Sequence, residues 1–338
     1  MKPGTAEETE TARRPRAGSC FIIATRDRHD HLAAAVESLV EQTVLPVELC
    51  IVDASERTPA RARIEQLCAE VGLRLDYVHP APPGLTVQRN LGIDRTTGDP
   101  VFLIDDDVRM APDVHEQILA EYERWGPELG GVRGAALHPP VANPLAVLWR
   151  RLFGMETWRA EASGRVRPGF YTDAVTSSAV VRRVEAFNGW FMSFRREVFA
   201  HERFDERLAG YAFKEDADFS YRVSKRGYVL VQTPAARIEH LKTPSQRLTP
   251  FELQRMNLAN QLYLHRKNMP QTLKHRAALW WALTGTFVLM VGKAVQARDP
   301  GYVTGMLVGV WEQAHGRGLV DAAAEGERRG GKRGAKTA

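Results

Sequence analysis

Short apolar segments alternate with amphipathic segments along the amino-terminal part of the chain, starting at residue 19. We predict four strands, at residues 19–25, 47–53, 73–78 and 101–104. We predict four helices, one after each strand, at residues 31–41, 59–71, 85–96 and 112–124. Strands and helices in alternation are joined by right-handed crossovers, which produce a mainly parallel sheet with helices over its faces. The chain is therefore expected to fold as an α/β protein.

Ligands of such sheets bind beyond the carboxyl ends of the strands. The predicted site therefore lies just after Thr25, Asp53, Val78 and Ile104. Three of these four places carry polar or acidic residues, so we expect the functional groups at this edge.

The middle of the chain, residues 130–184, contains several prolines and aromatic residues but no regular pattern. We interpret it as long functional loops rather than as a second core. Regular patterns return at residues 187–194, 228–231 and 235–240.

Three consecutive carboxylates, Asp105, Asp106 and Asp107, follow the fourth predicted strand. Like charges this close repel one another unless a cation or a network of donors offsets the repulsion. Mg²⁺ and Mn²⁺ prefer oxygen ligands and bridge phosphates, so we interpret the run as a site for a divalent cation. A solvated acidic turn is the alternative, but the position at the end of a strand favours the cation.

A second acidic group, Glu215, Asp216 and Asp218, comes where a helix is predicted to begin. A carboxylate at the mouth of a cleft can remove the proton of an attacking hydroxyl as a general base. Asp216 is our candidate for that role, and helix capping is the alternative for one of these carboxylates. His240 closes a predicted strand, and only its company with the acids makes it a candidate metal ligand.

Together these segments resemble the family-two glycosyltransferases of the GT-A fold, over residues 19–268. The similarity is carried, in chain order, by residues 21–27, 47–55, 88–107, 188–189, 204–206, 215–216 and 240. In that family the earlier segments bind the donor and its metal ion, and the later ones bind the acceptor. The order and spacing of the segments are more specific than any one of them.

The resemblance implies a Rossmann-like, mostly parallel sheet and transfer of a single sugar, with inversion, from a nucleotide-sugar donor to an acceptor hydroxyl. It implies that Asp105, Asp107 and His240 bind a divalent cation, Mn²⁺ or Mg²⁺, and that Asp216 is the catalytic base. It implies a nucleotide site made by Thr25, Arg26, Asp27, Asp53, Arg89, Asn90, Asp105 and Asp106.

Two departures from the family pattern bear on specificity. Asp53 is followed by alanine where a second acid or an amide is common, so the choice of nucleobase stays open. The Gln-x-x-Arg-Trp motif does not follow His240, which argues for single-sugar transfer instead of processive polysaccharide synthesis.

The composition fits a protein of a reducing compartment. Cys20, Cys50 and Cys68 include no Cys-x-x-Cys pair, so we predict neither a disulfide framework nor a zinc site. The first twenty residues are polar and lack an apolar signal region, so we expect the catalytic part to lie on the cytoplasmic side. The net charge of +5 comes largely from the two ends of the chain, a distribution that disfavours a nucleic-acid partner.

Residues 277–292 carry no charged side chain and have basic residues on both sides. The segment is short for a bilayer span, but Trp280 and Trp281 suit a membrane interface. We predict association with the cytoplasmic face of the cell membrane and a lipid-linked or cell-envelope glycan as acceptor. A helix packed inside a soluble, cytoplasmic protein is the alternative.

These features divide the chain into a flexible basic tail, a GT-A domain, a hydrophobic helical extension and a second basic tail. The expected bounds of the four parts are residues 1–17, 18–270, 271–320 and 321–338.

Two other functions combine a similar sheet with acidic residues. A sugar-phosphate nucleotidyltransferase binds triphosphate with a glycine-rich loop after the first strand, and here residues 25–30 contain no glycine. A degenerate, non-enzymatic binding module would have lost an acid from the metal or base motif, and neither motif has lost one. A metal-dependent glycosyltransferase is therefore the favoured interpretation.

Overall fold

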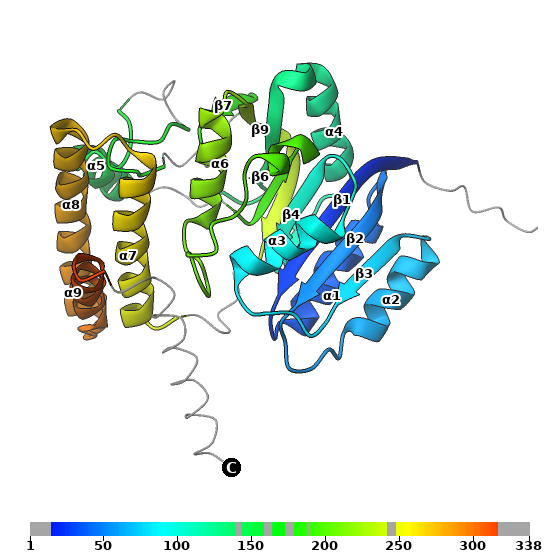
Figure 1. Ribbon diagram of the computed structural model, residues 1–338, viewed down its shortest axis with the longest axis horizontal. Coiled ribbons are helices and arrows are strands. Elements are labelled where there is room, and N and C mark those ends of the chain that lie inside the picture. Colours follow the sequence, from blue (N-terminus) through cyan, green and yellow to red (C-terminus); the bar gives the residue numbers. More distant parts are fainter. Residues whose placement is uncertain are drawn as a thin grey trace, which may run out of the picture.

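The computed structural model describes residues 15–139, 143–158, 164–172, 179–187, 189–241 and 248–316. Figure 1 shows two parts of the molecule: a twisted sheet with helices packed on it, and a group of long helices beside it. The strands are β1 (Arg16–Thr25), β2 (Leu45–Asp53), β3 (Arg74–Val78), β4 (Val101–Asp105), β5 (Val108–Met110), β6 (Leu129–Ala136), β7 (Arg182–Val184), β8 (Phe191–Phe194) and β9 (Val229–His240). They form one sheet in the order β3-β2-β1-β4-β8-β6-β9-β5, and β7 pairs with β9.

Nine helices are described. They are α1 (His29–Val40), α2 (Arg61–Glu70), α3 (Leu85–Arg95), α4 (Val114–Trp125), α5 (Pro144–Leu152), α6 (Glu215–Lys225), α7 (Pro250–Asn268), α8 (Leu273–Ala297) and α9 (Gly301–Ala314). The four strands and four helices predicted up to residue 125 are confirmed, with ends that shift by a few residues.

The parallel pairing of β1 to β4 brings the predicted site residues to one edge. Thr25 lies opposite Asp53, and Ala24 lies opposite Asp105, so the acidic residue of β4 and the polar ends of β1 and β2 are level. Alternate residues of β1 and β4 face opposite sides of the sheet: Phe21 and Phe102 pack toward α1 and α4, whereas Ile22 and Leu103 pack toward α3 and α6. Both faces are therefore covered, as predicted.

The expectation of a mostly parallel sheet holds only for this first half. β8 runs antiparallel to both β4 and β6, and β9 is antiparallel to β5 and β7. The sheet as a whole is mixed, because the segments after β4 return as short antiparallel strands that local periodicity did not reveal.

The interpretation of residues 130–184 as loops is wrong at α5 and β7, and also at its start, where β6 is a buried central strand. Its sequence, rich in glycine, lacks the apolar alternation of an ordinary strand. The glycine at position 131 is required by packing: a Cβ there would lie 2.8 Å from the Phe194 ring and from the Ser193 carbonyl oxygen. The two later patterns at 228–231 and 235–240 join into the single strand β9.

Helices α7, α8 and α9 pack together through a separate apolar cluster that includes Leu258, Leu283 and Met306. The predicted domain boundary at residue 270 falls between α7 and α8. Helix α7 contacts both predicted domains: its Tyr263 hydroxyl donates to Asp205 (2.6 Å), and the helix also packs on α9. The domain division remains a prediction. Of the predicted tails, only residues 15–17 are described, and Arg16 already begins β1.

Candidate active site

The acids after β4 and the histidine at the end of β9 meet at the carboxyl edge of the sheet. β5 pairs with β9 so that Val108 lies opposite His240. One ligand atom each of Asp105, Asp107 and His240 lie within 4.8 Å of one another. The structure thus brings together the three residues predicted to bind metal from positions more than a hundred residues apart.

The chemistry of this cluster fits a divalent cation. The Asp107 Oδ1 atom is buried and makes no hydrogen bond of good geometry with any described residue, although His240 Nε2 lies 3.2 Å away. Two carboxylates and an imidazole are suitable ligands for Mn²⁺ or Mg²⁺. A buried carboxylate oxygen without a donor is costly unless a cation meets it.

Arg28, just before α1, contacts the same acids. Its Nη1 atom donates to Asp106 Oδ1 (2.8 Å) and to Asp107 Oδ2 (3.0 Å). Burial acts to raise the pKa of Asp107, but His240 and Arg28 outweigh burial and the pKa lies below its ordinary value. Burial raises the pKa of Asp106 to about 6, although Arg28 and the Thr25 hydroxyl, which donates to Asp106 Oδ2 (2.8 Å), oppose the rise. Asp106 is therefore held by protein donors, and Asp107 faces the cluster.

Arg89 links the cluster of Asp105, Asp107 and His240 to the acids at the start of α6. Its side chain is only 2% exposed, and Nη2 donates to Asp105 Oδ1 (2.9 Å) while Nη1 donates to Glu215 Oε1. A buried guanidinium with two carboxylate partners fixes their relative position. The predicted nucleotide residue Arg89 is thus a bridge between the β4 end and the start of α6.

Asp216 lies in the first turn of α6, where the helix packs closely against Gly189. Lys214, which precedes the helix, has a left-handed backbone (φ 76°) and gives no side-chain cap. A Cβ on Gly189 would lie 2.8 Å from the Asp216 Cβ, so only glycine permits this approach. Asp216 is partly exposed, and its Oδ1 accepts from the Ala217 N–H (2.7 Å). Asn188, which the sequence pattern paired with Gly189, lies outside the described residues.

Three of the other predicted nucleotide residues lie at the end of β2 or just after the end of β1. Asp53 is fully buried; it accepts from the Ser55 N–H (2.8 Å) and the Tyr77 hydroxyl (2.6 Å). Arg26 and Asp27 are exposed on the loop after β1, and the Asp27 N–H donates to Ser55 Oγ (2.6 Å). These contacts tie the β1 and β2 loops together at the edge that carries the acids.

Asn90 does not join this group. Its amide donates to the Phe204 carbonyl oxygen (3.0 Å) and to Glu206 Oε1 (2.8 Å), and its Oδ1 accepts from the Phe204 N–H (3.0 Å). The side chain is buried and holds the segment that leads to α6. Its contact with the nucleotide stays a prediction. The contacts that the structure shows for Asn90 are those with Phe204 and Glu206.

Sequence reasoning missed Arg28 and Trp190. The Trp190 ring stacks on His240 with centroids 5.8 Å apart, and its carbonyl oxygen accepts from the Asp105 N–H (3.0 Å). Trp190 directly follows Gly189. An aromatic residue next to this glycine was the signal that could have identified it. For Arg28, the corresponding signal was a basic side chain just after the first predicted strand.

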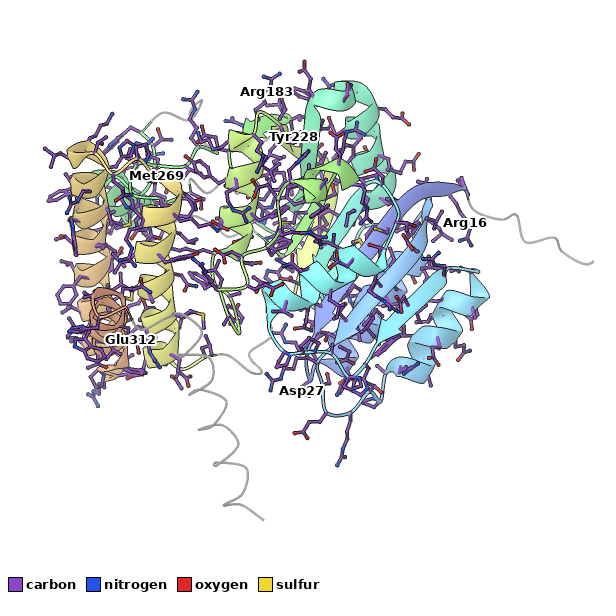
Figure 2. The ribbon with its side chains drawn as sticks, in the orientation of Figure 1. Arg16, Asp27, Arg183, Tyr228, Met269 and Glu312 are labelled. Carbon is purple, nitrogen blue, oxygen red and sulfur yellow. The ribbon has the colours of Figure 1, made fainter. Side chains whose placement is uncertain are left out.

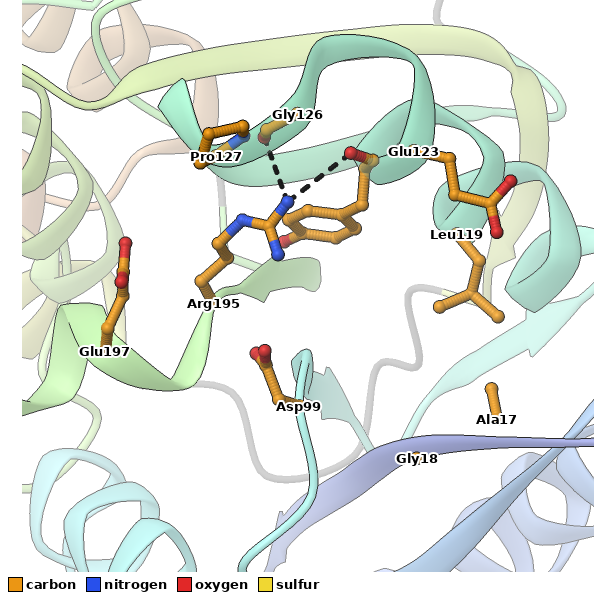
Figure 3. A pocket seen from close by; sticks show the side chains of 10 residues that line it. Ala17, Gly18, Asp99, Leu119, Glu123, Gly126, Pro127, Arg195 and Glu197 are labelled. Atoms are coloured by element: carbon orange, nitrogen blue, oxygen red, sulfur yellow. Dashed lines mark hydrogen bonds between the residues drawn. The ribbon is translucent and has the colours of Figure 1, made fainter.

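Figure 3 shows a surface pocket of about 560 Å³ that lies away from these acids. It is lined by the start of β1 at Ala17 and Gly18, by Asp99 before β4, and by Arg195, whose guanidinium donates to the Gly126 carbonyl oxygen (2.9 Å). These residues lie at the amino ends of the central strands, the edge opposite the ligand-binding edge of an α/β sheet. The acidic cluster is therefore the better candidate for the active site.

Residues 20–143 match the model of the family described as glycosyl transferase family 2. The match covers 124 of the 338 residues, so this part of the chain resembles the family. The matched segment contains β1 to β4 and the acids at Asp105–Asp107, which are the elements that build one side of the site.

Two curated relatives are similar to this chain. The succinoglycan biosynthesis protein ExoM of Rhizobium meliloti is 28% identical over 162 residues, which are 46% of this chain and 49% of that protein, so the chain spans about half of its length. The N-acetylglucosaminyl-diphospho-decaprenol L-rhamnosyltransferase of Mycobacterium tuberculosis is 24% identical over 286 residues, which cover 77% of this chain and 85% of that enzyme.

A solved structure supports the fold over nearly the whole chain. The mannosyltransferase of Pyrobaculum calidifontis, in complex with GDP-mannose and Mn²⁺, superimposes with a TM-score of 0.51 and 15% identity. The match covers 92% of this chain and 87% of that one. The predicted GT-A fold is confirmed.

Proposed function

We propose that this protein transfers one sugar from a nucleotide-sugar donor to a hydroxyl of a lipid-linked or cell-envelope glycan, with inversion and with a divalent cation. The observation that carries the proposal is the meeting of Asp105, Asp107 and His240 at the carboxyl edge of the sheet, with Arg89 joining them to Glu215 beside Asp216. Metal-type ligands and a candidate base thus occupy one site.

Asp105, Asp107 and His240 are the residues that would hold the cation, and Mn²⁺ and Mg²⁺ are the candidates. Bound to the donor diphosphate, the ion would supply stabilisation of the charge that develops on the leaving nucleotide. Arg28 supplies one positive charge to Asp106 and Asp107 together, and Arg89 shares its charge with Glu215. The site therefore keeps an excess of negative charge that favours a cation.

Asp216 is the best candidate for the base among the three acids of α6. Glu215 is paired with Arg89, and Asp218 is fully buried between Arg222 and Lys267. Asp216 alone of the three is partly exposed. In the proposed step it removes the acceptor hydroxyl proton while that oxygen bonds the anomeric carbon, and the bond from this carbon to the donor phosphate breaks on the opposite face.

The donor is proposed to lie along the loops after β1 and β2. Thr25, Arg26, Asp27 and Asp53 are at those strand ends, where nucleotides bind in sheets of this kind. Arg28 is close enough to the acids to contact donor phosphates as well.

The acceptor is proposed to be attached to a lipid at the cytoplasmic face of the membrane. The mycobacterial relative that covers most of this chain is named for a diphospho-decaprenol substrate. Among the described residues, α8 is the one helix long and apolar enough to cross a membrane. Both observations favour work at a lipid surface.

Calorimetric titration with a panel of nucleotide sugars, with and without Mn²⁺, tests the proposal. We expect one nucleotide class to bind only with the metal, and Asp107→Asn to abolish metal-dependent binding because it removes a charged ligand. Glu123→Gln, at an exposed acid on α4, is the matched control and should bind normally. Metal-independent binding, or unchanged affinity in Asp107→Asn, would contradict the proposed site.

A further inference from the structure

We propose that α5 and α8 together form one membrane-docking face that lies in the plane of a single leaflet and meets anionic headgroups. The membrane face does not depend on the catalytic proposal, but its use for a lipid-linked acceptor rests on the proposed function. Figure 1 places α8 at the edge of the molecule farthest from β2 and β3, with α5 beside it.

The outer face of α8 is an apolar stripe along the length of the helix. Its members recur every three or four positions, so they share one side. They are Ala277, Trp280, Trp281, Thr284, Phe287, Val288, Val291 and Val295, all of them exposed. Trp280 is 54% exposed and Val295 is 74% exposed. Leu279, Leu283 and Met290, on the opposite side, are buried against α7 and α9. This exposed stripe is much more extended than the scattered apolar residues of an ordinary surface.

Helix α5 adds a second apolar face, in the region that the sequence suggested was a loop. Leu145, Leu148 and Leu152 lie at positions i, i+3 and i+7, and are 76%, 50% and 56% exposed. None of the residues of α5 is buried, and packing on the protein through Trp149 does not explain the three exposed leucines. A short helix with such a pattern is typical of membrane interfaces.

The two helices are held together as one unit. Trp149 Nε1 donates to the Gly285 carbonyl oxygen (3.0 Å), and Trp281 Nε1 donates to the Leu152 carbonyl oxygen (2.9 Å). The Phe153 ring stacks on Trp281 with centroids 4.8 Å apart, and a Cβ on Gly285 would overlap this ring. The exposed leucines of α5 are therefore fixed beside the tryptophans of α8.

The packing of α8 favours an in-plane helix over a spanning one. Its inner face is covered by α7 and α9, which are joined by the ion pair of Arg255 and Glu312. A spanning α8 would carry these charges toward the hydrocarbon core, at a high cost in free energy. An in-plane α8 keeps them on the aqueous side.

The charges around the stripe suit anionic lipid. Lys274 and Arg276 at the start of α8, and Lys293 and Arg298 near its end, are all exposed. Long basic side chains at the edges of an apolar face reach headgroups while their stems stay in the interface. A negatively charged bilayer surface is therefore the partner that matches both the apolar stripe and its ends.

A short chain of contacts joins this face to the proposed base. The Thr286 hydroxyl of α8 lies 3.2 Å from the Tyr171 hydroxyl, and the Lys214 ammonium lies 5.1 Å from the Tyr171 ring centroid. Lys214 directly precedes Glu215 and Asp216. Docking at α5 and α8 would thus hold the base close to the headgroup region, where the sugar of a lipid-linked acceptor lies.

Flotation of the full chain with vesicles of phosphatidylcholine, with and without phosphatidylglycerol, tests the face. We expect binding that is stronger with phosphatidylglycerol. We expect a loss of about tenfold or more in affinity for Leu148→Glu and for Val288→Glu, because each removes an apolar contact with the bilayer and adds an unfavourable charge. Val47→Glu, at an exposed apolar residue of β2, is the matched control and should bind as the unchanged protein does.

Each other outcome identifies a failure of the inference. Loss in Val288→Glu with normal binding in Leu148→Glu would overturn the shared face. A dimer in solution that Leu148→Glu separates, with no change in vesicle binding, would assign the face to a second copy of the chain. Metal-dependent donor binding in the same variants reports on the active site, so a failed docking face and a failed catalytic proposal give different patterns.

Discussion

At the scale of single residues, the three acids of α6 are distinguished by their partners. Asp216→Asn keeps the size of the side chain but cannot accept a proton, so we expect turnover to fall about 10²–10⁴-fold while donor binding survives. Turnover at saturating donor and acceptor, measured on a folded variant, checks this.

The matched variant is Asp218→Asn. Asp218 is buried and accepts from Lys267 (2.9 Å) and Asn268 (2.8 Å), so its loss should lower thermal stability more than it lowers the rate per folded molecule. Near-normal turnover of Asp216→Asn would reassign the base to Glu215.

His115 is a buried histidine that links α4 to β1 and carries a pH prediction. Its Nδ1–H donates to the Val44 carbonyl oxygen (2.7 Å), its Nε2 accepts from the Ser19 hydroxyl (2.7 Å), and burial lowers its pKa from 6.5 to about 4. The unfolded chain therefore takes up the proton first as pH falls. The contribution of His115 is complete above pH 6.5 and is lost progressively down to about pH 4, by about 3 kcal/mol.

Urea unfolding of the unchanged protein and of His115→Gln, between neutral pH and pH 4, measures this effect. We expect the difference in unfolding free energy between the two proteins to shrink as pH falls. A difference that is constant with pH would show that His115 does not titrate on unfolding.

At the scale of elements, α7 and α9 approach each other closely at glycines. A Cβ on Gly305 would lie 2.3 Å from the Phe251 carbonyl oxygen, and one on Gly309 would lie 2.5 Å from that of Arg255. We expect Gly305→Ala to force the helices apart and to cost about 1–3 kcal/mol of stability. Thermal unfolding measures it.

The control is Gly292→Ala in α8, where an added Cβ meets no atom within 4 Å. Alanine there should leave stability unchanged or raise it by about 0.5–1 kcal/mol, since alanine favours the helix. Equal effects of the two substitutions would mean that the close packing of α7 and α9 does not contribute to stability.

At the scale of the whole molecule, the parallel strands, the antiparallel strands and the helical group meet around the acids. Figure 2 shows side chains in the space between α6 and α7. Arg89 joins the β4 end to α6, and Lys267 joins α6 to α7 through Asp218. The proposed donor site, base and docking face are therefore parts of one packed body, and a chain cut at residue 270 would lose partners of α7.

The α/β alternation and the acids at the end of the fourth strand could be predicted from the amino-acid sequence alone. These features depend on spacing between near neighbours, which local periodicity reports directly. The order of the later motifs could also be predicted, because Glu215, Asp216 and His240 lie at the ends of predicted elements.

The remaining features come from contacts between distant parts of the folded chain. Strand β6 has glycine at position 131 because Phe194 and Ser193 leave no room for a side chain there, and its glycine content hides the strand from local periodicity. The contacts of Arg28 with the acids and the stack of Trp190 on His240 join residues far apart in the chain. The amphipathic helix α5 gains meaning only from its contact with α8. Such features depend on which distant surfaces meet, and no local pattern contains that information.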